Sequence, residues 1–172
     1  MLFRSRQSPD NRSKGPELVV LHTDNPYEIV RQRKTCGPNY DVSNEDVLAK
    51  LKEWESLCRF EIMQVEPDTL VLNLQTLPKD LCSFAEDVYA FCPDTVDQGV
   101  GNMEEDEYPE VFAAARALCP DRAPKAVTSA LSRVVPEEED ELADEYAATA
   151  EIGVKLLAYS FHEARQVYLW WD

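Results

Sequence analysis

Basic side chains are scarce in this sequence: 17 lysines and arginines stand against 33 aspartates and glutamates, so the formal net charge is −16 at pH 7. A field of that sign repels nucleic acid and anionic membranes and attracts basic surfaces. Long apolar runs are also missing, which argues against a membrane-spanning helix, and residues 1–15 lack the apolar stretch of a signal peptide. We therefore expect a cytoplasmic protein with a basic protein partner, bound to neither nucleic acid nor membrane.

Paired cysteine spacings and recognisable catalytic motifs are absent as well. The cysteines are odd in number, none has Cys-x-x-Cys spacing, and most have apolar neighbours; they are Cys36, Cys58, Cys82, Cys92 and Cys119. This pattern favours reduced thiols in the cytoplasm over a disulfide framework. The sequence has no P-loop, no dinucleotide-binding glycine fingerprint and no zinc-ligand spacing. The absence of these motifs removes the recognisable enzyme classes without excluding an enzyme, and we assign no cofactor, no metal and no catalytic residue from them.

The charge is unevenly distributed along the chain. Residues 1–40 carry seven basic and four acidic side chains, whereas residues 41–102 sum to −9 and residues 103–172 to −10. Residues 1–15 are polar, basic and unpatterned, which is typical of a flexible tail. The length suits one domain, so we expect a single α+β domain over residues 16–172, with an acidic helical insertion at about residues 103–139.

Hydrophobic spacing and turn residues predict the order of the elements. We expect a strand at 17–23, a helix from Ser43, a hairpin of strands 60–65 and 70–74, a helix from Pro78 to Cys92, short helices at 110–119 and 125–135, a long helix from 136 to about 161, and a strand at 167–172. Ser43 and Asp46 have the spacing of a capping box. Residues 24–39 suit either a short helix or an extended segment.

This order matches a split βαβ, ferredoxin-like fold. We expect a small four-stranded sheet with helices on one face and the helical insertion before the last strand. Because a strand at the chain end is ordered only when it is paired, we place residues 167–172 in the sheet.

Three motifs together resemble an uncharacterised bacterial family, domain-of-unknown-function family 4253. They are Gly37-Pro38-Asn39-Tyr40-Asp41, then Phe91-Cys92-Pro93-Asp94 followed by Val96-Asp97-Gln98-Gly99, and finally Tyr168-Leu169-Trp170-Trp171-Asp172. The similarity covers roughly residues 17–102 and 140–172, whereas residues 103–139 depart from the family pattern. The resemblance implies a shared fold and supplies no reaction. Small acidic domains of this kind also resemble immunity proteins, as an analogy only.

Asp94 and Asp97 lie in the motif at the end of a predicted helix, with Gln98 and Gly99 next to them. Two carboxylates three residues apart are suited to bind a hard cation through oxygen, or to contact a partner. The structural alternative is that they accept hydrogen bonds from nearby amides in turns, and that Gly99 supplies a positive φ. We favour the structural alternative.

Trp170 and Trp171 are consecutive in a predicted strand, followed by Asp172. Their indoles should point to opposite faces, so one enters the core. The other is either an exposed contact anchor or covered by the inserted helices.

Two acidic runs fall in or next to the predicted insertion; they are Glu104-Glu105-Asp106-Glu107 and Glu137-Glu138-Glu139. Such runs are usually solvated faces, but two of them in one insertion favour a recognition surface. Our leading hypothesis is a non-enzymatic binding protein, such as an immunity protein that occludes the basic cleft of a protein partner. The alternative is a metal-assisted hydrolase that uses Asp94 and Asp97.

Overall fold

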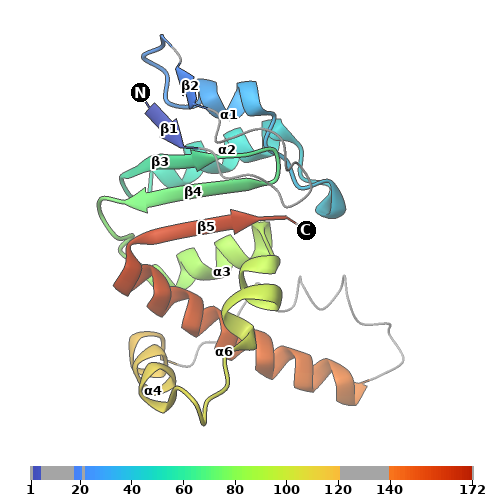
Figure 1. Cartoon of the computed structure of the whole chain (residues 1–172). Coiled ribbons are helices and arrows are strands. Elements are labelled where there is room, and N and C mark those ends of the chain that lie inside the picture. Colours follow the sequence, from blue (N-terminus) through green and yellow to red (C-terminus); the bar gives the residue numbers. More distant parts are fainter. Residues whose placement is uncertain (1, 5–17, 21, 121–139, 172) are drawn as a thin grey trace. The chain divides into compact units, whose positions relative to one another are not determined.

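A computed structural model describes residues 2–4, 18–20, 22–120 and 140–171 (Figure 1). These residues fall into two compact units. The sheet unit comprises Met1–Thr76 and Gln166–Asp172, and the helical unit comprises Leu77–Arg165. Most of the expected tail, residues 5–15, lies outside the described residues. The single domain expected over residues 16–172 stays a prediction.

The sheet unit contains five strands, two α-helices and one 3-10 turn within the described residues. In chain order they are β1 (Leu2–Arg4), β2 (Leu18–Val20), α1 (Glu28–Arg33), η1 (Pro38–Tyr40), α2 (Asn44–Glu55), β3 (Phe60–Val65), β4 (Thr69–Leu74) and β5 (Gln166–Trp170). The segment at residues 24–39, left open by the sequence, forms α1 and the start of η1.

The main sheet has three antiparallel strands in the order β3-β4-β5, so the prediction of four strands was wrong. The predicted first strand exists as β2, but it is short and pairs with β1 in a separate two-stranded sheet, with Phe3 opposite Val19. The split βαβ, ferredoxin-like arrangement was therefore also wrong, although the α+β class holds. The predicted pairing of the last strand is confirmed, because Leu169 of β5 lies opposite Leu70 of β4.

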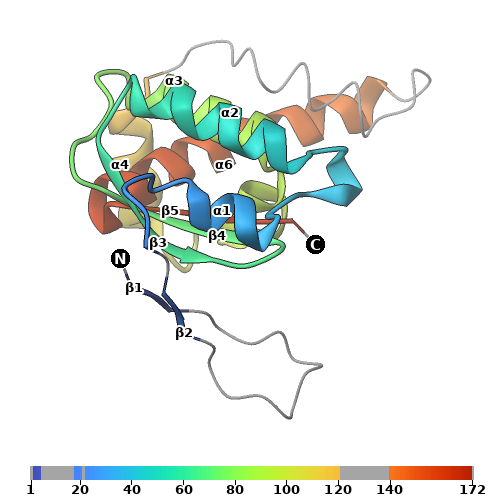
Figure 2. The same ribbon diagram turned by 90° about the horizontal axis from the view of Figure 1, so that it is seen from above.

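Alternate side chains of β4 and β5 point to the same face of the three-stranded sheet, and this face is buried. Leu70 and Leu72 of β4 and Val167 and Leu169 of β5 are all fully buried. Within the sheet unit, α1 and α2 lie on one face of the sheet (Figure 2). The predicted apolar stripe of α2 is confirmed, with Trp54 fully buried. Its capping box is present as well, since the Ser43 side chain accepts from the Asp46 amide and the Asp46 side chain accepts from the Ser43 amide.

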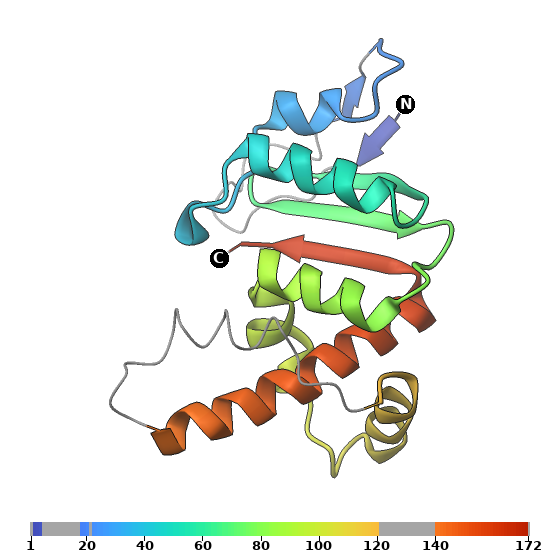
Figure 3. The same ribbon diagram turned by 180° about the vertical axis from the view of Figure 1, so that it is seen from behind.

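The helical unit consists of α3 (Leu81–Phe91), the π-helical turn η2 (Thr95–Gly99), the 3-10 turn η3 (Val100–Asn102), α4 (Pro109–Leu118) and α6 (Asp140–Ala164). Both α3 and α4 pack against α6, as Figure 3 shows for α4 (yellow) and α6 (orange to red). Phe84 of α3 meets Phe161 of α6 edge to face, with ring centroids 5.8 Å apart.

Three helix predictions have different outcomes. The helix expected at 110–119 is confirmed as α4, and the one expected at 125–135 lies outside the described residues. The helix expected from Pro78 begins three residues later, because Asp80 caps it by accepting from the Ser83 amide at 3.0 Å. No helix in the described ranges is long and apolar enough to cross a membrane.

Candidate functional site

The loop that follows α3 is held by a local hydrogen bond and by close packing of Val96 against Gly153 of α6. Cys92 caps α3, and the Thr95 hydroxyl donates to the Cys92 carbonyl at 2.7 Å. Val96 is buried, and a Cβ atom at Gly153 of α6 would lie 2.3 Å from its Cγ1. Glycine at position 153 is therefore what lets α6 approach η2. The predicted positive φ at Gly99 was wrong, since its φ is −110°.

The two carboxylates of this loop bind separate neighbours. Asp94 is only 1% exposed and accepts from the Gln98 amide nitrogen at 2.8 Å. Asp97 is exposed and accepts from the Tyr89 hydroxyl at 3.0 Å. The donors in these two hydrogen bonds are side chains, whereas the structural alternative expected backbone amides. Within the residues that the structure describes, no three histidine, cysteine or acidic side chains come together as metal ligands do.

The acidic segment Glu104–Glu107 lies on the surface between η3 and α4. All four of its carboxylate residues are exposed, and so is the next aromatic residue, Tyr108, at 46%. Pro109 then begins α4. Proline lacks a backbone N–H, and the first turn of a helix does not need one. With exposed Glu110, these residues form what we call the acidic surface, Glu104–Glu110. An exposed aromatic side chain within this acidic run is the feature that the sequence analysis missed.

Arg116 of α4 fixes one carboxylate of the acidic surface. Its two terminal nitrogens donate to the two oxygens of Glu105 at 2.6 and 2.7 Å, which is the bidentate geometry of a strong charge-assisted pair. The hydrogen bond from Arg116 is the main reason why the pKa of Glu105 is lowered. The guanidinium also lies over the Phe112 ring, 5.8 Å from its centroid. The acidic surface is thereby tied to α4.

A small apolar cluster holds α4 against α6. Its buried members are Phe112 and Ala115 of α4 and Leu156 of α6, with half-buried residues such as Ile152 and Tyr159 around them. Three side chains of the cluster are buried, and the others that pack against them are only partly buried.

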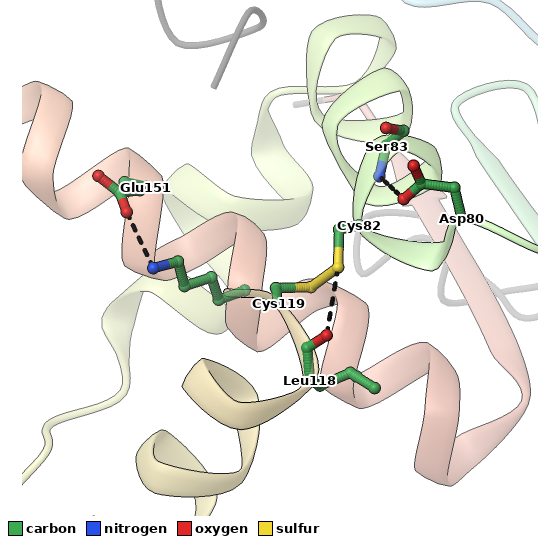
Figure 4. Close-up of a disulfide and its surroundings, with 7 residues drawn as sticks. Asp80, Cys82, Ser83, Leu118, Cys119 and Glu151 are labelled. Carbon is green, nitrogen blue, oxygen red and sulfur yellow. Dashed lines mark hydrogen bonds and ion pairs between the residues drawn. A yellow bond between two sulfur atoms is a disulfide. The ribbon is translucent and has the colours of Figure 1, made fainter. Parts of the chain in front are cut away.

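A disulfide joins Cys82, in the first turn of α3, to Cys119, which caps α4 (Figure 4). The prediction that all five cysteines are reduced was therefore wrong for this pair; Cys36, Cys58 and Cys92 are thiols. The half-cystines are 37 residues apart in sequence, with Cα atoms 5.8 Å apart. In the chain-entropy model, closing a loop of that length lowers the conformational entropy of the unfolded chain and so raises its free energy by about 4 kcal/mol. The cytoplasmic location stays a prediction, and it can no longer rest on these two cysteines.

A small pocket lies beside the disulfide. Both half-cystines line it, together with Glu86 of α3 and with Glu151 and Lys155 of α6. The Lys155 ammonium pairs with Glu151 at 2.9 Å. The pocket has about 20 Å³ of room, enough for a water molecule and far less than the several hundred Å³ of an ordinary small-molecule site.

The motif at the end of the chain has a structural role in the sheet unit. Trp171 is 4% exposed, and its indole lies against Gly37, where a Cβ atom would come within 2.5 Å of the ring. The Trp171 amide also donates to the Asp68 carbonyl at 3.1 Å. The prediction that one indole enters the core is confirmed. Trp170 is half-buried and contacts exposed Tyr168 at a centroid distance of 5.1 Å.

The remaining predicted candidates divide by position. Asp94, Asp97, Gln98 and Glu104–Glu107 belong to the helical unit, whereas Trp170 and Trp171 belong to the sheet unit. Glu137, Glu138, Glu139 and Asp172 lie outside the described residues. The structure adds Tyr108, Arg116 and the Cys82–Cys119 pair. Tyr108 carries a signal in the sequence, as an aromatic residue inside an acidic run, but the partners of Arg116 and Cys82 depend on the fold.

The described residues thus form an α+β protein made of a sheet unit and a helical unit. The chain belongs to the family of the domain of unknown function DUF4253, whose model matches residues 17–172. The match includes residues 103–139, which the sequence analysis had set apart from the family pattern. No curated protein and no solved structure matches the chain.

Proposed function

We propose that this protein is a non-enzymatic binding protein that recognises a basic protein partner through the acidic surface, Glu104–Glu110. The observation that carries the proposal is the run of exposed carboxylates on both sides of exposed Tyr108 in the chain, with Glu105 fixed by Arg116. Aromatic residues are enriched at the energetic centres of interfaces, and carboxylates around them select a positively charged partner.

Charge distribution supports the same surface. The helical unit carries seven basic and twenty acidic side chains, whereas the sheet unit carries ten and thirteen. The net charges are thus −13 and −3, so a basic partner is steered to the helical unit. An inhibitor of the immunity type would act by occlusion, with the carboxylates taking the place of an anionic substrate in the basic cleft of its target.

The metal-assisted hydrolase that uses Asp94 and Asp97 has less support. Asp94 is buried and Asp97 accepts from a tyrosine, so each carboxylate is engaged within the protein. No observation in the described part of the chain favours this alternative, and we do not develop it.

The test measures how fast a labelled octalysine peptide, as a basic probe, associates with two variants of equal net charge. E104Q/D106N/E107Q removes three charges from the acidic surface, and the control E45Q/E53Q/E61Q removes three exposed charges from the sheet unit. We expect the first variant to slow association about tenfold at low salt, because it removes local steering charge. The control should change the rate by less than about twofold.

Tyr108→Ala tests the aromatic part of the surface. It leaves the charge unchanged and should raise the dissociation rate rather than lower the association rate. Equal effects of the two triple variants on association would refute the proposal, because the binding would then follow net charge and not this surface.

A further inference from the structure

The Cys82–Cys119 disulfide closes a loop of the chain that contains the acidic surface, and Cys119 lies at the end of α4 opposite to Glu110. The chain between the two half-cystines contains η2, η3, the acidic surface and α4. Arg116, which holds Glu105, precedes Cys119 by three residues and so lies one turn away on the same helix. The position of the C-terminal end of α4 therefore determines where Arg116 holds the acidic surface.

Other restraints on α4 are weaker than this covalent bond. The apolar cluster of Phe112, Ala115 and Leu156 holds α4 against α6 by packing alone. The Arg116–Glu105 pair is about half exposed on both sides, and exposed ion pairs contribute little to stability on their own. Breaking the disulfide therefore removes the strongest connection between α4 and α3.

The two half-cystines differ in burial. Cys82 is half-buried and Cys119 is buried, so Cys82 is the more exposed residue of the pair and its sulfur is the point of attack in this inference. Both half-cystines line the small pocket with Lys155, Glu86 and Glu151. A cation near a half-cystine favours departure of a thiolate, while the two carboxylates limit that effect.

We propose that the Cys82–Cys119 disulfide is a redox lock that keeps the acidic surface in its binding conformation, and that a dithiol reductant releases it. One thiolate of the dithiol attacks the Cys82 sulfur, the bond to Cys119 breaks, and Cys119 leaves as a thiolate. The second thiolate of the dithiol then displaces Cys82. Two electrons and two protons pass to the protein, which ends with two thiols, and the dithiol ends as a disulfide.

This inference rests on the proposed function, because the surface that it regulates is the proposed binding surface. In the reduced protein, α4 loosens and Arg116 no longer fixes Glu105, so binding must order these groups again. Disulfides that form in a reducing compartment are usually transient or redox-sensing. A lock of this kind would couple binding to the thiol redox state of the compartment.

The experiment compares binding of the octalysine probe by the oxidised protein, the protein reduced with dithiothreitol, and the C82S/C119S variant. We expect reduction to weaken binding about tenfold, the loss that follows when a few interface side chains must be ordered on binding. C82S/C119S should bind like the reduced protein and should not respond to dithiothreitol. Alkylation followed by mass mapping identifies which cysteines were reduced.

A second measurement does not depend on the probe. Amide hydrogen exchange in residues 109–118 should accelerate on reduction, while exchange in residues 44–55 of α2 serves as the internal control. Dithiothreitol titration of the unmodified chain gives the same comparison if C82S/C119S fails to fold.

Equal binding and equal exchange before and after reduction would overturn the lock. If E104Q/D106N/E107Q still slowed association in that case, the proposed function would stand without the lock. If the two triple variants behaved alike in the oxidised protein, the proposed function would fail, and faster exchange on reduction would then report a purely structural disulfide.

Discussion

The two units of this protein are stabilised in different ways. In the sheet unit, buried polar groups connect the helices and loops: the Asn44 amide donates to the Val30 and Thr35 carbonyls at 3.0 and 2.9 Å, and the Thr35 hydroxyl donates to the Glu66 carbonyl at 2.6 Å. The Arg33–Glu66 ion pair, at 2.7 Å, is largely buried as well. These contacts have little exposure to solvent, so they specify the fold.

The helical unit also has buried polar side chains, in Asp94, Thr95 and Lys155, but its helix α4 is held by a disulfide and an exposed ion pair. Arg116 and Glu105 are each about half exposed, and most of the net charge of the protein lies in this unit. The comparison shows that most of the net charge lies in the unit whose helix α4 is held by a disulfide and an exposed ion pair. We place recognition in the helical unit for that reason.

The largest expected effect tests the buried end of the sheet unit. Trp171→Ala should lower the free energy of unfolding by about 3–5 kcal/mol, because it leaves a cavity against Gly37. Trp170→Ala, the matched control, should lower it by about 1 kcal/mol, since Trp170 is half-buried and its ring contacts exposed Tyr168. Urea unfolding followed by circular dichroism measures both values, and similar losses would contradict the assignment of Trp171 alone to the core.

An intermediate effect compares one polar contact from each unit. Asn44→Ala should lower the free energy of unfolding by about 2 kcal/mol, because it leaves two backbone carbonyls without their side-chain donor. Arg116→Gln should change stability little, since the Arg116–Glu105 pair is exposed. A larger loss from Arg116→Gln than from Asn44→Ala in the same urea experiment would reverse the comparison.

The smallest effect concerns two exposed carboxyls with lowered pKa values. The Ser43 hydroxyl lowers the pKa of Asp46 in the sheet unit, and Arg116 lowers that of Glu105 in the helical unit, from ordinary values of 3.8 and 4.5. A carboxyl whose pKa is lower in the folded state stabilises the fold above its ordinary pKa. That contribution disappears as the pH falls through the folded pKa.

NMR titration of the carboxyl carbons separates the two cases. Ser43→Ala should raise the pKa of Asp46 toward 3.8 and leave Glu105 unchanged, and Arg116→Gln should raise the pKa of Glu105 toward 4.5 and leave Asp46 unchanged. The stability difference between the unmodified protein and Ser43→Ala should shrink below pH 3.8. A change in Asp46 on substitution of Arg116 would show that the two carboxyls are not independent.

Local sequence signals predicted much of the secondary structure. Ser43 and Asp46 form the expected capping box, and the alternation of Leu70, Leu72 and Leu74 correctly predicted a strand with one buried face. The strand at the end of the chain was predicted from the need to pair it. In each case, residues close together in the sequence carry the information.

Long-range pairing was not predictable in the same way. The short run Leu18–Val20 carried a strand signal, but nothing in the sequence indicates that it pairs with Leu2–Arg4 instead of the main sheet. The Cys82–Cys119 bond joins positions 37 residues apart with no characteristic spacing, and the match of Arg116 to Glu105 depends on where α4 packs. At the candidate site, the sequence supplied the acidic residues, and the fold supplied the contacts that arrange them.

The order in which the sheet is assembled has a consequence for synthesis on the ribosome. Strand β5 pairs with β4, yet residues 75–165 separate them in the sequence. Until residue 166 has emerged, a nascent chain has only the β3-β4 hairpin, and isolated hairpins are marginally stable in water. Gly37 likewise has no indole to contact until Trp171 arrives. Completion of the sheet therefore waits for translation of the entire helical unit.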